Sequence, residues 1–161
     1  MNIQDFQTHP FTKFDKEWAL LTAGVKDDFN SMTISWGGMG TLWHKPVVFL
    51  FVKPVRYTYE FVERHDEITV SFYDKQYRKA LSLFGSKSGR DMDKAKAAGL
   101  TPKVLENGVT YEEAKETLIC KKLTMQKLDK SAFPKEALQF YQLKGEELAH
   151  CLVIAEVTEI I

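Results

Sequence analysis

Residues 47–63 read VVFLFVKPVRYTYEFVE. The first six residues, 47–52, are all apolar and mostly β-branched or aromatic, and a run this short predicts a buried strand. Pro54 lacks the N–H group that a central strand needs, so the chain must turn there. Thr58 is then well placed to cap a helix that runs through Glu63. The stretch therefore predicts a strand, a turn and a helix in direct succession.

The start of this predicted helix is suited to binding an anion. The first-turn N–H groups of a helix lack partners within the helix, and they lie at the positive end of its dipole. Arg56 can add a forked pair of charge-assisted hydrogen bonds to phosphate oxygens. An ordinary capped helix beside a surface arginine would contain the same residues, so the local chemistry leaves both interpretations open.

Length and charge restrict the classes of function. The chain has 161 residues, which predicts a single domain over residues 1–161 with a substantial core. Its 22 basic residues balance 22 acidic ones, and no long basic block is present. Net neutrality gives no electrostatic reason to expect nucleic acid or an anionic membrane as partner. Small ligands and other proteins remain as candidates.

The cysteines, the histidines and the N-terminal composition predict a cytoplasmic protein without a metal site. Residues 1–20 contain no signal-peptide pattern, and no apolar run approaches membrane-spanning length. Cys120 and Cys151 form no CxxC motif and are expected to be reduced, buried thiols. The four histidines share no helical ligand spacing.

Strands predominate along the rest of the chain. The sequence predicts an antiparallel hairpin, with strands at 18–24 and 31–36 and a turn at 27–28. A glycine-rich loop at 37–40 precedes the strand at 47–52, and further strands are expected at 68–72, 117–128 and 151–161. Helices are expected at 76–84, ending at a left-handed Gly85, and at 91–98, ending at Gly99, with a helical turn within 134–143. This pattern favours a closed or nearly closed antiparallel β-barrel with peripheral helices over a doubly wound parallel sheet.

Two further segments are polar or rich in small residues. Residues 85–94, GSKSGRDMDK, combine glycines, which allow close backbone approach to a flat ligand, with small hydrogen-bond donors. In residues 30–36, NSMTISW, polar and apolar side chains alternate along one predicted strand. A solvated loop and a half-buried strand would account for them equally well. No GxGxxG, P-loop or GxSxG motif is present.

Taken together, NSMTISW, KPVRYTYEFVE, GSKSGRDMDK and AGLTP resemble the flavin reductase-like, FMN-binding split-barrel family, which includes flavoredoxins. The resemblance extends from about Trp18 to the C-terminus. It implies a mainly β, six-stranded antiparallel split barrel of Greek-key type that forms a homodimer. It also implies one FMN in a groove near each end of the dimer interface.

The resemblance implies three groups of FMN-binding residues and one catalytic residue. Arg56, Tyr57 and Thr58 match the phosphate turn. The strand along the ribityl chain and ring is matched by Asn30, Ser31, Met32 and Thr33, with Ser35 and Trp36 near the polar edge of the ring. The loop over the cofactor is matched by Gly85, Ser86, Lys87, Ser88 and Gly89, with Lys87 expected near the pyrimidine end of the ring. His150 is expected near the flavin and the nicotinamide, as a structural or a catalytic residue.

A flavoprotein of this kind needs no acid–base dyad, because the cofactor supplies the redox chemistry. The resemblance implies an NADH- or NADPH-dependent FMN reductase, or a flavoredoxin-like electron carrier with a small-molecule or protein acceptor. The alternatives are a non-catalytic FMN-binding protein and an oxidase of the pyridoxine-phosphate type.

Overall fold

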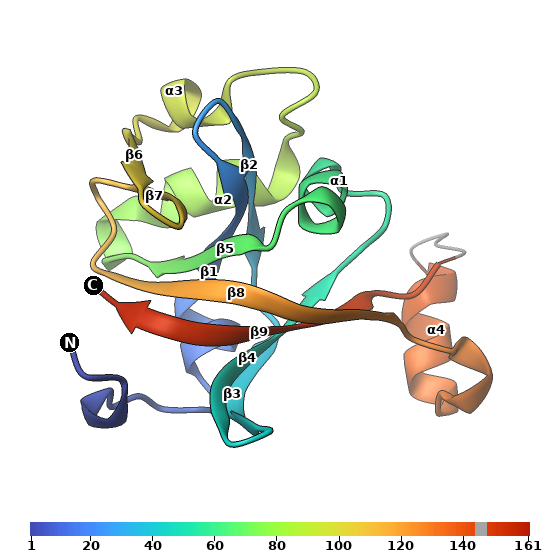
Figure 1. Ribbon diagram of the computed structural model, residues 1–161. Coiled ribbons are helices and arrows are strands. Elements are labelled where there is room, and N and C mark those ends of the chain that lie inside the picture. The colour runs from blue at the N-terminus through green and yellow to red at the C-terminus, as the bar shows by residue number, and fades with distance from the viewer. Residues whose placement is uncertain (144–147) are drawn as a thin grey trace.

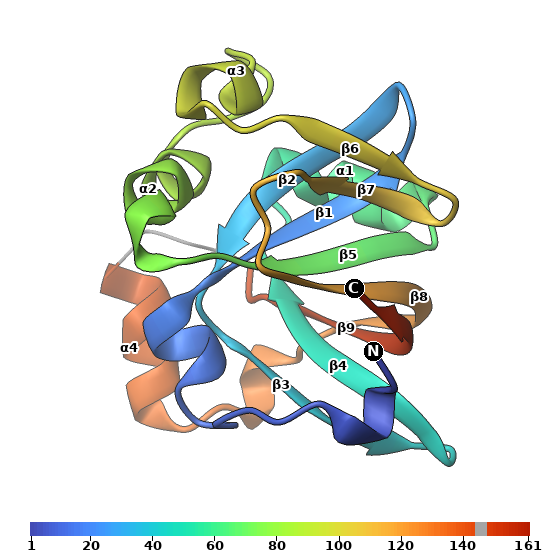
Figure 2. The same cartoon turned by 90° about the vertical axis from the view of Figure 1, so that its left-hand side faces the viewer.

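Seven antiparallel strands form the principal sheet of the computed structural model, which describes residues 1–143 and 148–161. The strands are β1 (Ala19–Val25), β2 (Asp28–Ile34), β3 (Gly37–Leu42), β4 (Lys45–Val52), β5 (Glu67–Phe72), β8 (Glu116–Lys127) and β9 (Cys151–Ile160). Their order in the sheet is β2-β1-β5-β8-β9-β4-β3. The sheet curls strongly, as the two views in Figure 1 and Figure 2 show.

The barrel is split between β2 and β3, which are the two edge strands of the sheet order. Only Ser35 and Trp36 separate the end of β2 from the start of β3. Successive Cα atoms are about 3.8 Å apart, so a connection of two residues is short. It therefore keeps the end of β2 close to the start of β3. Since β2 and β3 are not hydrogen-bonded neighbours, the edges separate beyond that point. The fold is therefore a split barrel, as predicted.

The helices and a small hairpin lie around this sheet. The helices are α1 (Tyr57–Arg64), α2 (Arg78–Ser86), α3 (Lys94–Ala98) and α4 (Lys135–Leu143), and the hairpin is β6 (Pro102–Leu105) with β7 (Gly108–Tyr111). Short helical turns occur at Ile3–Asp5, Lys13–Glu17, Lys75–Tyr77 and Lys130–Ala132. Figure 1 shows α2, α3 and the hairpin together on one side of the sheet, and α4 apart from them beside β9 and β4.

Apolar side chains form two cores, one on each face of β1. Leu21 packs inside the barrel with Val48, Leu50 and Val153, whereas Leu20 faces the opposite way and packs beneath α2. Both leucines are fully buried. A strand with both faces buried has a continuous apolar sequence, which explains the unbroken run ALL at the start of β1.

All six predicted strands are present, and β3 is a seventh strand where the sequence predicted a loop. Gly38 pairs with Phe49 in the register of β3 and β4. A Cβ atom at Gly40 would lie 3.4 Å from the Phe49 ring, and one at Gly38 would lie 3.8 Å from it. The glycines of β3 thus leave room for a phenylalanine on the neighbouring strand, so here they mark a strand surface and not a loop. The predicted number of six strands was too low for this reason.

The predicted end of the helix at 76–84 was wrong by two residues, and the expected left-handed cap at Gly85 is not formed. Gly85 lies inside α2, which ends at Ser86, and Lys87 continues in an extended conformation. Gly99, by contrast, has φ +71° and closes α3 in the predicted left-handed conformation. The β6–β7 hairpin was not predicted.

Cys120 and Cys151 are free and buried, as predicted. Over the described ranges 1–143 and 148–161, the structure contains no helix long and apolar enough to cross a membrane. The same part of the chain brings no three His, Cys, Asp or Glu side chains together as a potential metal site.

Candidate cofactor site

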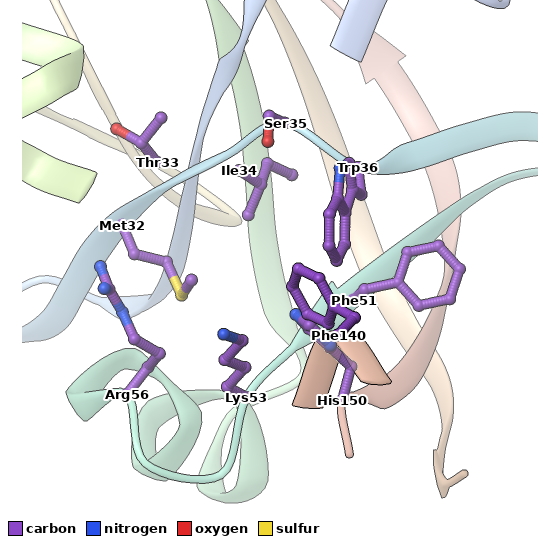
Figure 3. Close-up of a pocket in the computed structure, with 10 residues that line it drawn as sticks. All are labelled: Met32, Thr33, Ile34, Ser35, Trp36, Phe51, Lys53, Arg56, Phe140 and His150. Carbon is purple, nitrogen blue, oxygen red and sulfur yellow. The ribbon is translucent and has the colours of Figure 1, made fainter. Parts of the chain in front are cut away.

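A cavity of about 200 Å³ lies at the end of β2, beside the split in the barrel. We call it the ring pocket. Its lining residues are Met32, Thr33, Ile34, Ser35, Trp36, Phe51, Lys53, Arg56, Phe140 and His150. Figure 3 shows these side chains around the cavity, with β2 on one side and Phe51, Phe140 and His150 on another.

The predicted residues of β2 have different surroundings at this pocket. Met32 belongs to the barrel core and also lines the cavity. Thr33 points toward α2, and its hydroxyl donates to the carbonyl oxygen of Leu81. The hydroxyl of Ser31 lies 2.7 Å from that of Thr22 and 2.8 Å from that of Tyr111, in a buried network. The Ser31 side chain therefore lies outside the ring pocket.

Aromatic side chains form the wall of the ring pocket opposite β2. The ring of Trp36 lies 5.1 Å from that of Phe140 and 5.3 Å from that of His150, measured between centroids. The ammonium group of Lys53 lies 5.6 Å from the Phe140 centroid. Flat, apolar side chains with a cation at the edge are suited to a planar ligand that contains polar atoms on its rim.

A second cavity of about 190 Å³ lies between the start of α1 and the loop after α2. We call it the basic pocket. Its lining residues are Asn30, Val55, Arg56, Tyr57, Thr58, Ser86, Lys87, Ser88, Arg90 and Lys94. Four of these side chains are cationic and none is acidic. The basic pocket thus has the composition of an anion site at a helix N-terminus.

Arg56 lines both cavities and is the residue that connects them. It is the N-cap residue of α1. Its guanidinium donates to the carbonyl oxygens of Gly85 (2.8 Å) and Phe84 (3.2 Å) near the end of α2. Burial lowers the pKa of this guanidinium, which nevertheless stays charged at neutral pH. Arg56 therefore orients the end of α2 as well as lining the basic pocket.

The predicted capping role of Thr58 was wrong. Helix α1 begins at Tyr57, and no side chain caps its N-terminus. The hydroxyl of Thr58 instead accepts a hydrogen bond from the side-chain amide of Asn30 at 2.8 Å. This bond connects β2 to α1, and it leaves the first-turn N–H groups of α1 without a side-chain cap.

Lys94 is a site residue that the sequence analysis did not single out, although it closes the GSKSGRDMDK segment. Its side chain is only 5% exposed, and its amine donates to the carbonyl oxygens of Ser31 (2.6 Å) and Phe84 (3.4 Å). Burial, and then the nearby charge of Arg56, lower the pKa of Lys94 to about 8. Among the described residues no carboxylate pairs with it. The buried Lys94 and the half-buried Arg56 therefore lie close together, an arrangement that a bound anion would stabilise.

Gly89 brings the loop after α2 into contact with β2. A Cβ atom at this position would lie 2.3 Å from Oδ1 of Asn30 and 3.2 Å from the ring of Tyr57. Arg90 forms an ion pair with Glu60, and its guanidinium lies 4.7 Å from the Tyr57 centroid. Only glycine permits this close approach, as the sequence analysis expected for a loop that covers a ligand.

Lys87 lines the basic pocket with Ser86 and Ser88, and it is absent from the lining of the ring pocket. The cations at the ring pocket are Lys53 and Arg56. The backbone continues in an extended conformation after Ser86. The expected position of Lys87 near the pyrimidine end of a flavin ring stays a prediction.

His150 lies at the wall of the ring pocket, and its expected place near a flavin and a nicotinamide stays a prediction. It is 8% exposed and precedes β9 directly. Phe51, Lys53 and Phe140 complete this wall but were not predicted. Lys53 belongs to the KPVRYTYEFVE segment, which was a usable signal, whereas nothing in the sequence around Phe140 connects α4 to the pocket.

Comparisons with known proteins identify the family and the fold of this chain. Residues 11–161 match the model of the flavin reductase-like domain. No curated protein matches the sequence. Similar solved structures include the FMN-binding protein of Thermus thermophilus with bound 1-cyclohex-2-enone (TM-score 0.70, 18% identity, 97% of this chain and 78% of that one). They also include the flavoredoxins of Methanosarcina acetivorans (TM-score 0.69, 19% identity, 100% and 73%) and Desulfovibrio vulgaris (TM-score 0.70, 18% identity, 100% and 74%). At these identities the structures establish a common fold, and the family match covers nearly the whole chain: this protein belongs to the flavin reductase-like domain family.

Proposed function

We propose that this chain binds FMN, with the phosphate in the basic pocket and the isoalloxazine ring in the ring pocket. The observation that carries the proposal is Arg56, which lines both cavities and so makes them parts of one site. Each cavity, at about 200 or 190 Å³, is smaller than the roughly 300–1,000 Å³ of a usual ligand pocket. A ligand with a flat end and an anionic end would use both.

The donors in the basic pocket suit a phosphate dianion. Half-buried Arg56 and buried Lys94 supply positive charge, and Lys87, Ser86 and Ser88 supply further donors. The uncapped N-terminus of α1 adds N–H groups and the positive end of a helix dipole. These residues would hold the phosphate, while Gly89 allows the loop to lie close to β2.

The ring pocket would position the redox-active part of the cofactor. Bound FMN supplies hydride acceptance and onward electron transfer. Trp36, Phe51 and Phe140 would exclude water from the ring, and Lys53 and Arg56 would place positive charge near it. Such charge favours the reduced, anionic form of a flavin.

We further propose that NADH or NADPH reduces the bound flavin, which would make the protein a flavin reductase or a flavoredoxin-like electron carrier. Membership in the flavin reductase-like family and the flavoredoxin structures support this assignment. A passive FMN-binding protein and an oxidase of the pyridoxine-phosphate type are the competing activities. A cytoplasmic location belongs to this proposal, because NADH and NADPH are cytoplasmic reductants.

The partner proposed for this chain is a second copy of itself. On the outer face of β4 and β9, Phe49 lies beside Ile154 and Phe51 lies beside Leu152. All four side chains are half-buried. The residues between them, such as Leu50 and Val153, fill the barrel core, so this apolar face lies outside it. Phe51 also lines the ring pocket, so a partner covering this face would border the flavin.

Anaerobic stopped-flow mixing tests the activity. Protein reconstituted with FMN is mixed with saturating NADH or NADPH, and bleaching of the flavin absorbance is followed. The proposal predicts rapid bleaching by one of the two. Bleaching by neither would refute the reductase and leave the passive binder. In a separate aerobic assay without nicotinamide, hydrogen peroxide formed as O2 oxidises pyridoxine phosphate would instead support the oxidase.

A further inference from the structure

Lys94 is a buried amine that lines two cavities. One is the basic pocket, and the other is a neighbouring cavity of about 270 Å³ whose lining includes Phe84, Asp93 and Tyr111. The side chain is only 5% exposed. A modifying enzyme must admit a lysine side chain into its own active site, which such burial does not allow. Lys94 is therefore accessible to small molecules that fit these cavities.

The amine of Lys94 has the properties of a nucleophile. Within the described part of the chain it forms no salt bridge with a carboxylate, and it donates to the backbone oxygens of Ser31 and Phe84. Burial and the nearby charge of Arg56 lower its pKa to about 8, so roughly a quarter of the amine is neutral at pH 7.5. An ordinary lysine, with a pKa of about 10.4, is neutral to roughly 0.1% at that pH. A neutral Lys94 retains two N–H groups for both hydrogen bonds and has a lone pair for attack.

The basic pocket can hold a small anionic reagent beside this amine. Arg56 and Lys87 line the pocket together with Lys94, and the uncapped N–H groups at the start of α1 add the positive end of a helix dipole. A phosphate bound there would bring any group attached to it next to Lys94, because the same pocket contains them all. In an acyl phosphate, a single oxygen atom separates the carbonyl carbon from phosphorus. The carbonyl carbon would therefore lie close to the amine.

We propose that Lys94 is a modification site for acyl phosphates, in which the basic pocket binds the phosphate and Lys94 receives the acyl group. The neutral amine attacks the carbonyl carbon, and a C–N bond forms. The C–O bond to the phosphate breaks, and its electron pair leaves with the phosphate. The phosphate takes the proton that the nitrogen loses and departs as hydrogen phosphate. The cations that bind the reagent also stabilise this leaving group, and the product is an uncharged amide at Lys94.

Acylation would remove a positive charge from the site proposed for the FMN phosphate. The reagent and FMN would also compete for the same pocket. Loading with FMN would thus decrease as Lys94 becomes acylated, and bound FMN would protect Lys94. This consequence rests on the proposed function, whereas acylation of the apoprotein does not.

Acetyl phosphate is the probe for the modification. Apoprotein is incubated with it at pH 7.5, and peptide mass spectrometry follows the acetylation of each lysine with time. We expect Lys94 to be acetylated at least about tenfold faster than Lys96, an exposed lysine on the same helix, because far more of the Lys94 amine is neutral. Acetylation of Lys94 at the rate of Lys96, or more slowly, would overturn the proposal.

Acetic anhydride, an acyl donor without a phosphate, tests the role of the basic pocket. The ratio of the Lys94 rate to the Lys96 rate should be several times lower with the anhydride than with acetyl phosphate. Lys87→Gln should also lower the ratio obtained with acetyl phosphate. Lys79→Gln, which removes an exposed cation of α2 outside the basic pocket, is the matched control and should leave that ratio unchanged. Equal ratios for the two donors, or no effect of Lys87→Gln, would overturn the proposal.

FMN titration of the acetylated apoprotein tests the consequence for the cofactor. Acetylation of Lys94 should raise the FMN dissociation constant about tenfold, and Lys94→Gln, an uncharged mimic of acetyl-lysine, should bind FMN as weakly without any reagent. Prior loading with FMN should slow the acetylation of Lys94 but not of Lys96. An unchanged dissociation constant would refute the effect on cofactor loading. If unmodified wild type does not bind FMN, the proposed function fails, and the mass spectrometry still decides whether Lys94 is a modification site.

Discussion

At the scale of single residues, Arg56 connects the two ends of the proposed site. Its guanidinium bonds to the carbonyl oxygens of Phe84 and Gly85, so it both faces the basic pocket and orients the end of α2. Lys94 supports the same region through the carbonyl oxygens of Ser31 and Phe84. Lys94 is buried and Arg56 half-buried, and among the described residues neither forms a salt bridge with a carboxylate that would offset its charge.

Replacing Arg56 should weaken FMN binding. A charge-assisted hydrogen bond contributes about 1.5–3 kcal/mol, so Arg56→Ala is expected to raise the dissociation constant about ten- to a hundredfold. Arg56→Lys keeps the positive charge but lacks the paired N–H donors of the guanidinium, so it should give an intermediate dissociation constant. Lys79→Ala, an exposed cation on α2, is the control. Flavin fluorescence titration of the apoproteins gives the values, and equal affinities for wild type and Arg56→Ala would contradict the account.

FMN affinity should also depend on pH through Lys94. The pKa of this amine is about 8, lowered by burial and by Arg56. The charged form predominates below pH 8 and is lost above it, whereas a phosphate with a second pKa near 6 stays dianionic throughout. The dissociation constant of wild type should therefore rise from pH 7 to pH 9.5. Lys94→Met should bind more weakly at pH 7 and show a flatter profile, while Lys96→Met, on the exposed side of α3, should follow wild type. If the FMN dissociation constants of wild type and Lys94→Met changed with pH in the same way, this role of Lys94 would be excluded.

At the scale of elements, α1 is held at both ends by residues from distant strands. Asn30 of β2 bonds to Thr58 in its first turn. At the other end, the amine of Lys122 on β8 donates to the carbonyl oxygens of Val62 (2.6 Å), Glu63 (3.2 Å) and His65 (2.9 Å). These carbonyls have no partners within the helix, and a cation there is favoured by the helix dipole. Lys122 thus acts as the C-terminal cap of α1.

Lys122→Met should destabilise the protein while keeping most of the side-chain volume. Losing a charged donor to three carbonyl oxygens should lower the free energy of unfolding by about 1–3 kcal/mol. Lys121→Met removes an exposed neighbour on the same strand and should have little effect. Urea denaturation of both apoproteins measures the difference. Equal free energies of unfolding for Lys122→Met and Lys121→Met would show that water hydrogen-bonds these carbonyl oxygens as favourably as Lys122 does.

How far the sequence could predict these elements depended on how local their signals were. The strands at β1, β2, β4, β5, β8 and β9 were predicted because their apolar patterns are local. Strand β3 was not, since its glycines are explained by Phe49 on another strand. The turn before α1 was predicted from Pro54, but the bonds from Arg56 to α2 depend on the packing of distant segments. Phe140 was missed for the same reason, because α4 reaches the pocket only through the tertiary fold.

At the scale of the whole molecule, the split of the barrel and the outer face of β4 and β9 lie next to each other. Phe51 belongs to both, since it lines the ring pocket and pairs with Leu152 on that face. Within one copy, Trp36 and Phe140 of α4 lie in contact at this side of the ring pocket. A dimer formed through this face would enclose more of a flavin than one chain does.

Light scattering at micromolar concentration should report about twice the chain mass. A charge within the proposed interface should prevent dimer formation, so Phe49→Glu is expected to give a monomer with weaker FMN binding. Val104→Lys changes an exposed apolar residue on β6, far from this face in sequence and sheet, and should remain dimeric. A monomeric wild type that binds FMN tightly would contradict the shared groove.

Comparing FMN with riboflavin tests the central claim most directly, because the two differ only in the phosphate that the basic pocket is proposed to hold. Apoprotein titrated with each ligand should bind one FMN per chain, and riboflavin should bind at least about a hundredfold more weakly, because it forfeits several charge-assisted hydrogen bonds. Arg56→Ala should reduce this preference. Equal affinities for the two flavins, or no binding of either, would contradict the assignment of the two cavities as one FMN site.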